Sequence, residues 1–293
     1  MLTVFRGNRA EHLAELLAAQ LRLNPPGPCE TVQVVVNTWP TSRWLGEQLA
    51  VGLGGIAANI RYPFPGSQLR QIVQALLGDS SGDADPWRAS QLVWPVLELL
   101  PELVEQPEAA ALQQWLGRRQ GSASELDLGQ WQLGRSIADA LDDLALYRPD
   151  VLESWWEGRT PAQDDSAAWQ RLLVLRLAER LGVKPFGLRV LEAIALLQAG
   201  PPPAGSLPDP LRLFGLSSLA PIQVQLLQAL SVHTNVDLYL LTPCRDLWQR
   251  CTSRRQLLSD AIALQQPLDG DWLLQAPGLE ARFGRLGGEF QQL

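Results

Sequence analysis

The sequence predicts an α/β protein whose parallel sheet is built from both ends of the chain and is interrupted by a helical segment. Two observations predict this fold. Short apolar, β-branched runs alternate with amphipathic helical patterns at the start of the chain, and the same alternation returns near its end. Between them the periodicity is helical throughout. A length of 293 residues is enough for one large domain or two modest ones.

At the start of the chain, residues 2–5 predict a short strand, and Gly7-Asn8 predicts a turn that leads into a helix. Residues 24–28 contain three prolines, which end that helix. The β-branched run at 31–36 suits a strand buried on both faces, and a second helix is expected at about 41–53. This order of strands and helices is typical of βαβ units.

Residues 55–66 break the order, because two prolines within three residues forbid a helix and a central strand alike. A linker rich in Pro and Gly follows the helical segment at 200–205. After it we expect a strand at 211–216, a helix at 221–230 and a strand at 236–241. The predicted domains are a sheet domain in two parts, 1–65 and 205–293, and a helical insert, 66–204.

The formal net charge of -7 argues against a chain that coats nucleic acid or anionic membrane without selection. Residues 1–65 contain 5 basic and 4 acidic residues, residues 66–204 contain 12 and 19, and residues 205–293 contain 7 and 8. The helical insert therefore holds most of the excess negative charge. No run of apolar residues is long enough to span a bilayer. The first residues do not resemble a signal peptide, so we expect a cytoplasmic protein without membrane contact.

Lys184 is the only lysine among the 24 basic residues. A phosphate-binding P-loop needs a lysine followed by Ser or Thr, but Pro185 follows this one. A nuclease centre of the PD-(D/E)xK kind also needs a lysine beside its carboxylates, and Lys184 has no such neighbours. The glycines of 52–55 follow a helix rather than a strand, which is typical of a helix end. The sequence therefore predicts neither an ATPase nor a nuclease centre.

Three cysteines and two histidines match no disulfide framework and no zinc-binding spacing. We expect the cysteines to be reduced and buried, and we expect no metal in this chain. They are Cys29, Cys244 and Cys251.

Two features are candidates for binding a partner. Tryptophan is frequent, with 11 residues against six Phe and three Tyr, and these rings either pack in the core or stack on unpaired bases. In the helix at 135–148, Asp139, Asp142 and Asp143 share one face. That face is either solvated or accepts hydrogen bonds from bases, with Arg148 on a phosphate or a guanine edge. The tryptophans in or near loops and helix starts are Trp39, Trp44, Trp155, Trp156 and Trp169.

Four stretches carry a resemblance to a known family: Gly55-Ile-Ala-Ala-Asn-Ile60 with Tyr62-Pro-Phe-Pro65, Tyr147-Arg-Pro-Asp150 with Trp155 or Trp156 after it, Gly215-Leu-Ser-Ser-Leu-Ala-Pro221, and Thr242-Pro-Cys-Arg245. Together they resemble the N-terminal part of the RecC family, the gamma subunit of exodeoxyribonuclease V. The likeness runs from Leu2 to about Phe290. Family members are several times longer, so we expect this chain to be a piece of a longer subunit.

The resemblance implies a superfamily 1 helicase-like (1A) domain with an inserted all-α (1B) domain. In such a helicase a Walker A loop would follow the first strand, where this chain has Arg6-Gly-Asn-Arg9. An Asp-Glu pair would follow the strand at 211–216, where it has Gly215-Leu-Ser-Ser218. The resemblance thus implies a helicase-like fold that has lost its ATPase centre, and no enzyme activity for this chain alone.

By function, the resemblance implies a non-catalytic DNA-binding and scaffolding subunit of a RecBCD-type ATP-dependent helicase and exonuclease in double-strand-break repair and recombination. Such a subunit channels single-stranded DNA and reads the hotspot Chi. The implied partners are RecB-like and RecD-like motor and nuclease subunits, double-stranded DNA ends and single-stranded DNA. ATP and Mg²⁺ are expected only in the partner subunits. The implied DNA-binding residues are Asn37, Trp39, Arg43, Phe64, Arg70, Asp139, Asp142, Asp143 and Arg148.

Two other functions remain as alternatives. One is a helical protein-interaction adaptor whose tryptophans bury partner surface and which does not contact DNA. The other is a stand-alone nucleotide hydrolase with unusual motifs.

Overall fold

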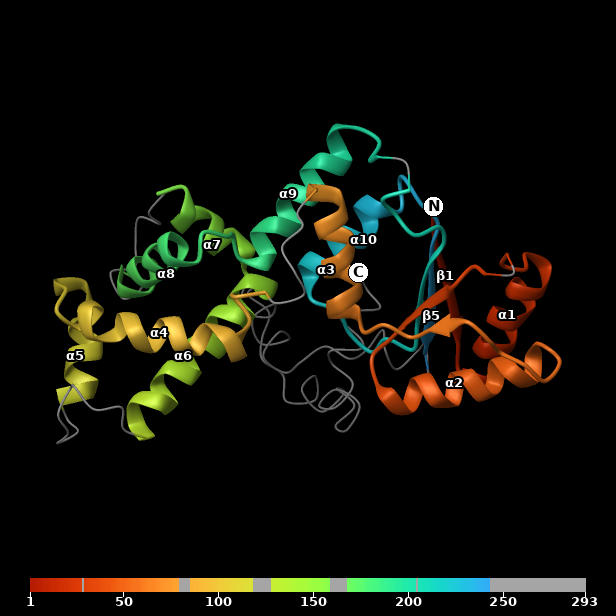
Figure 1. Ribbon diagram of the computed structural model, residues 1–293, viewed down its shortest axis with the longest axis horizontal. Helices are drawn as coiled ribbons and strands as arrows, with labels where there is room; N and C mark the ends of the chain where they lie inside the picture. The colour runs from red at the N-terminus through yellow and green to blue at the C-terminus, as the bar shows by residue number, and fades with distance from the viewer. Residues whose placement is uncertain (28, 79–84, 118–127, 159–167, 204, 243–293) are drawn as a thin grey trace, which may run out of the picture. The chain divides into compact units, whose positions relative to one another are not determined.

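The computed structural model describes residues 1–27, 29–78, 85–117, 128–158, 168–203 and 205–242 (Figure 1). Five strands of this part form one parallel sheet in the order β1-β5-β4-β2-β3. The strands are β1 (Leu2–Gly7), β2 (Val32–Val36), β3 (Ile60–Arg61), β4 (Leu211–Phe214) and β5 (Val236–Leu241). The predicted α/β class with a parallel sheet is confirmed.

The first strand pairs with the last strand that the structure describes. The register runs from Leu2 beside Val236 to Gly7 beside Leu241. At one end the Val236 amide donates to the Met1 carbonyl at 2.8 Å, and at the other the Thr242 amide donates to the Gly7 carbonyl at 2.8 Å. The two ends of the described chain therefore build one sheet, as predicted.

In the stretch at 55–66 the prediction of no central strand is confirmed, but the prediction of no helix is wrong. Ile60 and Arg61 form the short edge strand β3, and α3 begins at Pro65. An edge strand of two residues needs few ladder hydrogen bonds, so Pro63 only limits its length. Proline is tolerated in the first turn of a helix, where its missing N–H would have no partner. The prolines thus set the borders of these elements and do not exclude them.

The helices are α1 (Ala10–Leu23), α2 (Trp39–Gly52), α3 (Pro65–Leu77), α4 (Ala89–Val104), α5 (Ala110–Gly117), α6 (Leu128–Tyr147), α7 (Pro149–Trp156), α8 (Ala168–Leu181), α9 (Phe186–Ala199) and α10 (Pro221–Leu230), with a 3-10 turn η1 (Pro107–Ala109). Among the described helices none has the length and apolar character needed to cross a bilayer.

The chain divides into two compact units. The sheet unit comprises Met1–Ile72, Pro202–Leu219 and Leu227–Leu293, of which the structure describes residues up to 242. The helical unit comprises Val73–Pro201 and Ala220–Leu226. The sheet and α1 and α2 belong to the first unit, and α4 to α9 belong to the second (Figure 1).

In the sheet unit, α1 and α2 pack on one face of the sheet. Aromatic rings cross that face: Phe5 stacks on Tyr239 with centroids 5.0 Å apart, and Phe214 lies 5.9 Å from Tyr239. The Tyr239 hydroxyl is paired with Gln20 of α1, and burial raises the pKa of Tyr239. Apolar side chains fill the space between sheet and helices: Leu13, Leu17, Leu21, Val34, Val36, Leu45 and Leu49.

The helical unit has its own core, formed by α4 and α6 to α9. The predicted apolar stripe of α6 is buried there at Ile137, Leu141 and Ala145. Helices α6 and α9 approach so closely that a Cβ at Gly187 would lie 1.9 Å from the Ala145 carbonyl oxygen. The absence of a side chain at Gly187 is therefore a condition of this packing.

Helix α4 takes its N-terminal cap from α6. Arg88, the residue before the helix, forms no side-chain hydrogen bond to the first amides of α4. Instead, the Ala89 amide donates to Asp142 Oδ2 at 3.1 Å. The first amides of a helix have no partner within it, and a carboxylate there is favoured by the helix dipole. Asp142 thus joins α4 to α6 through a hydrogen bond between residues 53 positions apart.

We predict that Gly187→Ala destabilises the helical unit by about 3 kcal/mol, because the new methyl group meets backbone and α6 must move away from α9. Gly134→Ala is the control: its Cβ would lie 2.7 Å from Cδ2 and 2.9 Å from Cγ of Leu97, a side chain that can shift where the Ala145 backbone cannot, and alanine favours the helix. Urea unfolding midpoints measure both. Equal midpoints for the two variants would contradict the α6–α9 packing.

Asp142→Ala is expected to lower the free energy of unfolding by about 1 kcal/mol, the usual effect of losing a helix cap. Asp143→Ala removes the same charge from the exposed side of α6, and we expect a change within about 0.5 kcal/mol. Circular dichroism during urea unfolding compares the two. If Asp143→Ala is as destabilising as Asp142→Ala, loss of charge and not loss of the cap is the cause.

Candidate nucleic-acid interface

Two of the predicted residues follow neighbouring strands at the carboxyl edge of the sheet. Asn37 comes directly after β2, and Phe64 comes shortly after β3, which pairs with β2. The Val36 amide donates to the Pro63 carbonyl at 3.0 Å, so the two chain segments stay paired beyond the short strand β3. This hydrogen bond brings Asn37 and Phe64 close together, and both are exposed.

The first turn of α2 adds an aromatic ring and a positive charge. Thr38 caps the helix by accepting a hydrogen bond from the Thr41 amide at 3.2 Å, which fixes the direction in which α2 begins. Trp39 is 72% exposed and Arg43 lies four residues later, so both occupy one face of α2. Arg43 is exposed and forms no ion pair with another described residue.

The loop that carries Phe64 is anchored against α2. Tyr62 packs in the core beside Gly46, and burial raises the pKa of Tyr62 to about 12. Phe64 itself is 47% exposed, and its carbonyl accepts hydrogen bonds from the first amides of α3. The Arg70 guanidinium lies over the first turn of α3, 3.3 Å from the position of a Cβ at Gly66.

These five predicted residues, Asn37, Trp39, Arg43, Phe64 and Arg70, are called the carboxyl-edge patch below. Asn37 follows β2, and the others come from α2, the loop after β3, and α3. The patch combines an amide, two exposed aromatic rings and two guanidinium groups. Ligands of open parallel sheets bind outside the carboxyl ends of the strands, which is where these side chains lie.

The other four predicted residues belong to the helical unit. Arg148 is the one residue between α6 and α7. Its guanidinium donates two hydrogen bonds to the Asp150 carboxylate, both of 3.1 Å. Both side chains are exposed. The hydrogen bond and charge of Arg148 hold the pKa of Asp150 below its usual value. Arg148 is thus oriented by a neighbour, while its surface stays open to solvent.

The three aspartates of α6 differ in their surroundings. Asp139 pairs with Arg135 at 3.2 Å, Asp142 caps α4, and Asp143 is exposed. The structural role of Asp142 was missed in the sequence, because its partner lies on another helix and leaves no local pattern. The acidic face is therefore partly neutralised within the unit.

The five tryptophans named in the sequence differ in their exposure. Trp155 is buried, and Trp44, Trp156 and Trp169 pack against the cores of their units, so packing explains four of them. Trp39 alone of the five is exposed.

The expectation of buried cysteines is wrong for Cys29. This thiol is free and exposed, because it lies in the turn before β2 and outside the core. Cys244 and Cys251 lie outside the described residues.

The turn after the first strand is not of the kind that cradles phosphates. Only Asn8 and Arg9 separate β1 from α1, whereas a P-loop motif takes about eight residues. Glu11, in the first turn of α1, brings a negative charge to the helix end that would face a phosphate. Among the described residues, no cluster of three or more acidic, His or Cys side chains is placed to hold a metal ion.

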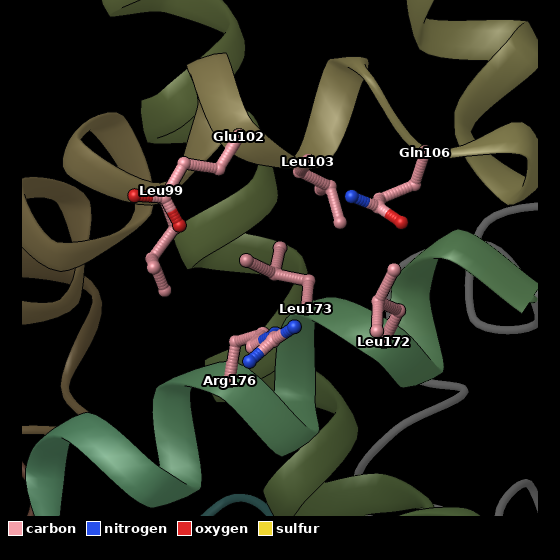
Figure 2. Close-up of a pocket in the computed structure, with 7 residues that line it drawn as sticks. All are labelled: Leu99, Glu102, Leu103, Gln106, Leu172, Leu173 and Arg176. Carbon is pink, nitrogen blue, oxygen red and sulfur yellow. The ribbon is translucent and has the colours of Figure 1, made fainter.

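A pocket of about 40 Å³ opens between α4 and α8 in the helical unit (Figure 2). A cofactor or nucleotide pocket has a volume of about 300–1,000 Å³, so this one is too small for either. It contains no predicted DNA-binding residue. Its lining residues are Leu99, Glu102, Leu103, Gln106, Leu172, Leu173 and Arg176.

Comparison with known proteins agrees with the sequence resemblance. Residues 2–293 match the family described as the N-terminal domain of RecC. The chain is 32% identical over 256 residues to the RecBCD enzyme subunit RecC of Mycolicibacterium smegmatis, covering 87% of this chain and 22% of that protein. It is 31% identical over 258 residues to the RecBCD enzyme subunit RecC of Mycobacterium tuberculosis, covering 85% of this chain and 23% of that protein. For Escherichia coli the identity is 29% over 261 residues, covering 85% and 22%.

The chain thus spans less than a quarter of the length of the curated relatives it matches. The match nevertheless extends over almost the whole of the present sequence, including both parts of the sheet unit and the helical unit between them. The chain therefore belongs to the RecC family, as its N-terminal domain.

Proposed function

We propose that this chain is the N-terminal part of a non-catalytic, DNA-binding and scaffolding subunit in a RecBCD-type helicase and exonuclease for double-strand-break repair. Its relatives carry the name of a RecBCD enzyme subunit. In this proposal the sheet unit is a helicase-like 1A domain, and the helical unit is a 1B domain inserted into it. RecB-like and RecD-like subunits supply the motors, the nuclease, ATP and Mg²⁺.

The observation that carries the proposal is the carboxyl-edge patch. Single-stranded DNA binds to aromatic rings on which bases stack and to cations that contact the phosphates. Trp39 and Phe64 are exposed rings, and Arg43 lies on the same face of α2 as Trp39. The hydrogen bond from the Val36 amide to the Pro63 carbonyl holds the segments that carry Asn37 and Phe64 together at one edge of the sheet. The patch thus has the chemistry and the position of a strand-binding surface.

Within the helical unit, Arg148 and Asp143 are the proposed contacts that read bases, for the hotspot Chi or another sequence. The planar guanidinium of Arg148 is oriented by its two hydrogen bonds to Asp150, which suits a contact with a guanine edge or a phosphate. Asp143 is an exposed acceptor for base N–H groups. Asp139 and Asp142 also belong to the proposed site, although each already has a partner within the unit.

The short turn between β1 and α1 supports a subunit without ATPase activity. Two residues offer too few backbone amides to surround a triphosphate. After β4, no acidic residue lies between Phe214 and Pro221 to hold Mg²⁺. In the proposal, ATP hydrolysis is therefore left to the partner subunits.

We predict that Trp39→Ala with Arg43→Ala raises the dissociation constant for a forked duplex about tenfold, through one lost stacking contact and one lost phosphate contact. The slope of log K against log salt is expected to fall in magnitude by about 0.7, as for one phosphate on a single strand. Fluorescence anisotropy with the full-length subunit and its motor partners measures both.

The control for this experiment is Arg176→Ala with Val232→Ala. Both side chains are exposed and lie outside the carboxyl-edge patch, and the double substitution removes the same charge. We expect binding within twofold of the unchanged protein. If both double variants weaken binding alike, the carboxyl-edge patch is not the DNA site.

For the helical unit, Arg148→Ala is expected to reduce sequence-dependent pausing of the translocating complex by at least fivefold, because a bidentate contact to a base contributes about 1–3 kcal/mol of discrimination. Arg176→Ala removes another exposed, ion-paired arginine of the same unit and is expected to leave pausing unchanged. Single-molecule translocation records give the pause probability. Normal pausing by Arg148→Ala would remove this residue from the proposed site.

A further inference from the structure

An apolar pocket lies at the amino edge of the sheet, opposite the carboxyl-edge patch. Its volume is about 220 Å³. Three segments surround it: the end of α1 with the turn after it, the end of α2 with the turn after it, and the first residues of β2 and β3. The lining residues are Leu21, Arg22, Pro25, Pro26, Val32, Leu53, Ala58 and Ile60.

The walls of this pocket are fixed by contacts within the sheet unit. The ends of α1 and α2 touch so closely that a Cβ at Gly52 would lie 2.6 Å from the Ala18 Cβ. The Arg22 guanidinium donates to the Gly52 carbonyl at 2.9 Å, which ties α1 to α2. The Asn59 amide group donates to the Glu30 carbonyl at 2.7 Å, which ties the turn before β3 to β2. The pocket is therefore preformed.

Three large apolar side chains close in sequence to the lining residues are not covered by any described residue. Leu23 is 80% exposed, Val51 is 79% exposed and Ile56 is 77% exposed. Leu23 and Val51 lie in the last turns of α1 and α2, and Ile56 lies in the turn after α2, each within two residues of a lining residue. Single exposed apolar residues are common, but a group of them around an apolar pocket indicates a binding surface.

The rim of the pocket carries one positive charge. Arg22 is exposed, is held in place by the Gly52 carbonyl, and has no carboxylate partner among the described residues. A guanidinium oriented in this way is suited to a carboxylate. The lining contains no aromatic ring on which a base could stack, and Arg22 is its one cation, so the chemistry favours a polypeptide.

We infer that this amino-edge pocket docks a segment of a partner subunit in which a large aliphatic or aromatic side chain stands next to an Asp or Glu. The apolar side chain fills the pocket, where truncation of such an anchor commonly has a large effect on affinity. The carboxylate pairs with Arg22. The inference rests on the proposed function only in expecting the partner within the same assembly.

The test uses the full-length subunit and the motor and nuclease subunits of the same organism. Ile56→Asp is expected to raise the dissociation constant of the assembly at least tenfold, and Arg22→Glu at least threefold, in sedimentation velocity. The control is Val232→Asp, which places the same charge at a side chain that is 77% exposed in another turn of the sheet unit. If both test variants assemble within twofold of this control, the inference is wrong.

A second measurement keeps the inference testable if either charged variant misfolds. In Ile56→Cys, the new thiol is expected to react with N-ethylmaleimide at least fivefold more slowly in the assembly than in the free subunit, read by peptide mass spectrometry. Val232→Cys is expected to react equally in both states. Equal rates at residue 56 would overturn the inference. Binding of forked DNA by the full-length subunit alone is expected to be unchanged in these variants, so failure here leaves the proposed DNA-binding function unaffected.

Discussion

Six parallel residue pairs join β1 to β5, from Leu2 beside Val236 to Gly7 beside Leu241, and the rest of the sheet unit depends on them. Pairing strands so far apart in sequence has an entropic cost that increases with the length of the closed loop. The aromatic contacts of Phe5 and Phe214 with Tyr239 and the apolar faces of α1 and α2 offset it. The long helical segment must therefore leave the sheet after β3 and return to it at β4.

A parallel sheet gives its two edges different roles. All turns that follow strands lie at one edge, and all turns that precede strands lie at the other. At the carboxyl edge, Trp39, Phe64 and Arg43 offer stacking and charge, whereas the amino edge offers an apolar pocket with Arg22 at its rim. The two proposed binding surfaces are thus separated by the length of the strands, so DNA and a partner subunit need not compete for the sheet.

The main elements could be predicted from the sequence, because β-branched runs such as 31–36 and a regular stripe such as Ile137, Leu141 and Ala145 are local patterns. Strand β3 could not, since two residues are too few to show a period. The cap that Asp142 forms on α4 depends on tertiary contact and leaves no local pattern. For the same reason the sequence did not distinguish Trp39, which is exposed, from the tryptophans that pack. The candidate site came from family resemblance, and the neighbouring positions of Asn37 and Phe64 follow from strand order.

The central claim is that the carboxyl edge of the sheet contacts the DNA strand in the assembled complex. A photoreactive benzoylphenylalanine in place of Phe64 tests it most directly, with the same group at Val232 as the control, because both side chains are exposed and lie at opposite edges of one sheet. On a forked duplex, irradiation should cross-link position 64 to the 3′-ended single strand and leave position 232 unlinked. Equal cross-linking at both positions, or none at position 64, would contradict the account.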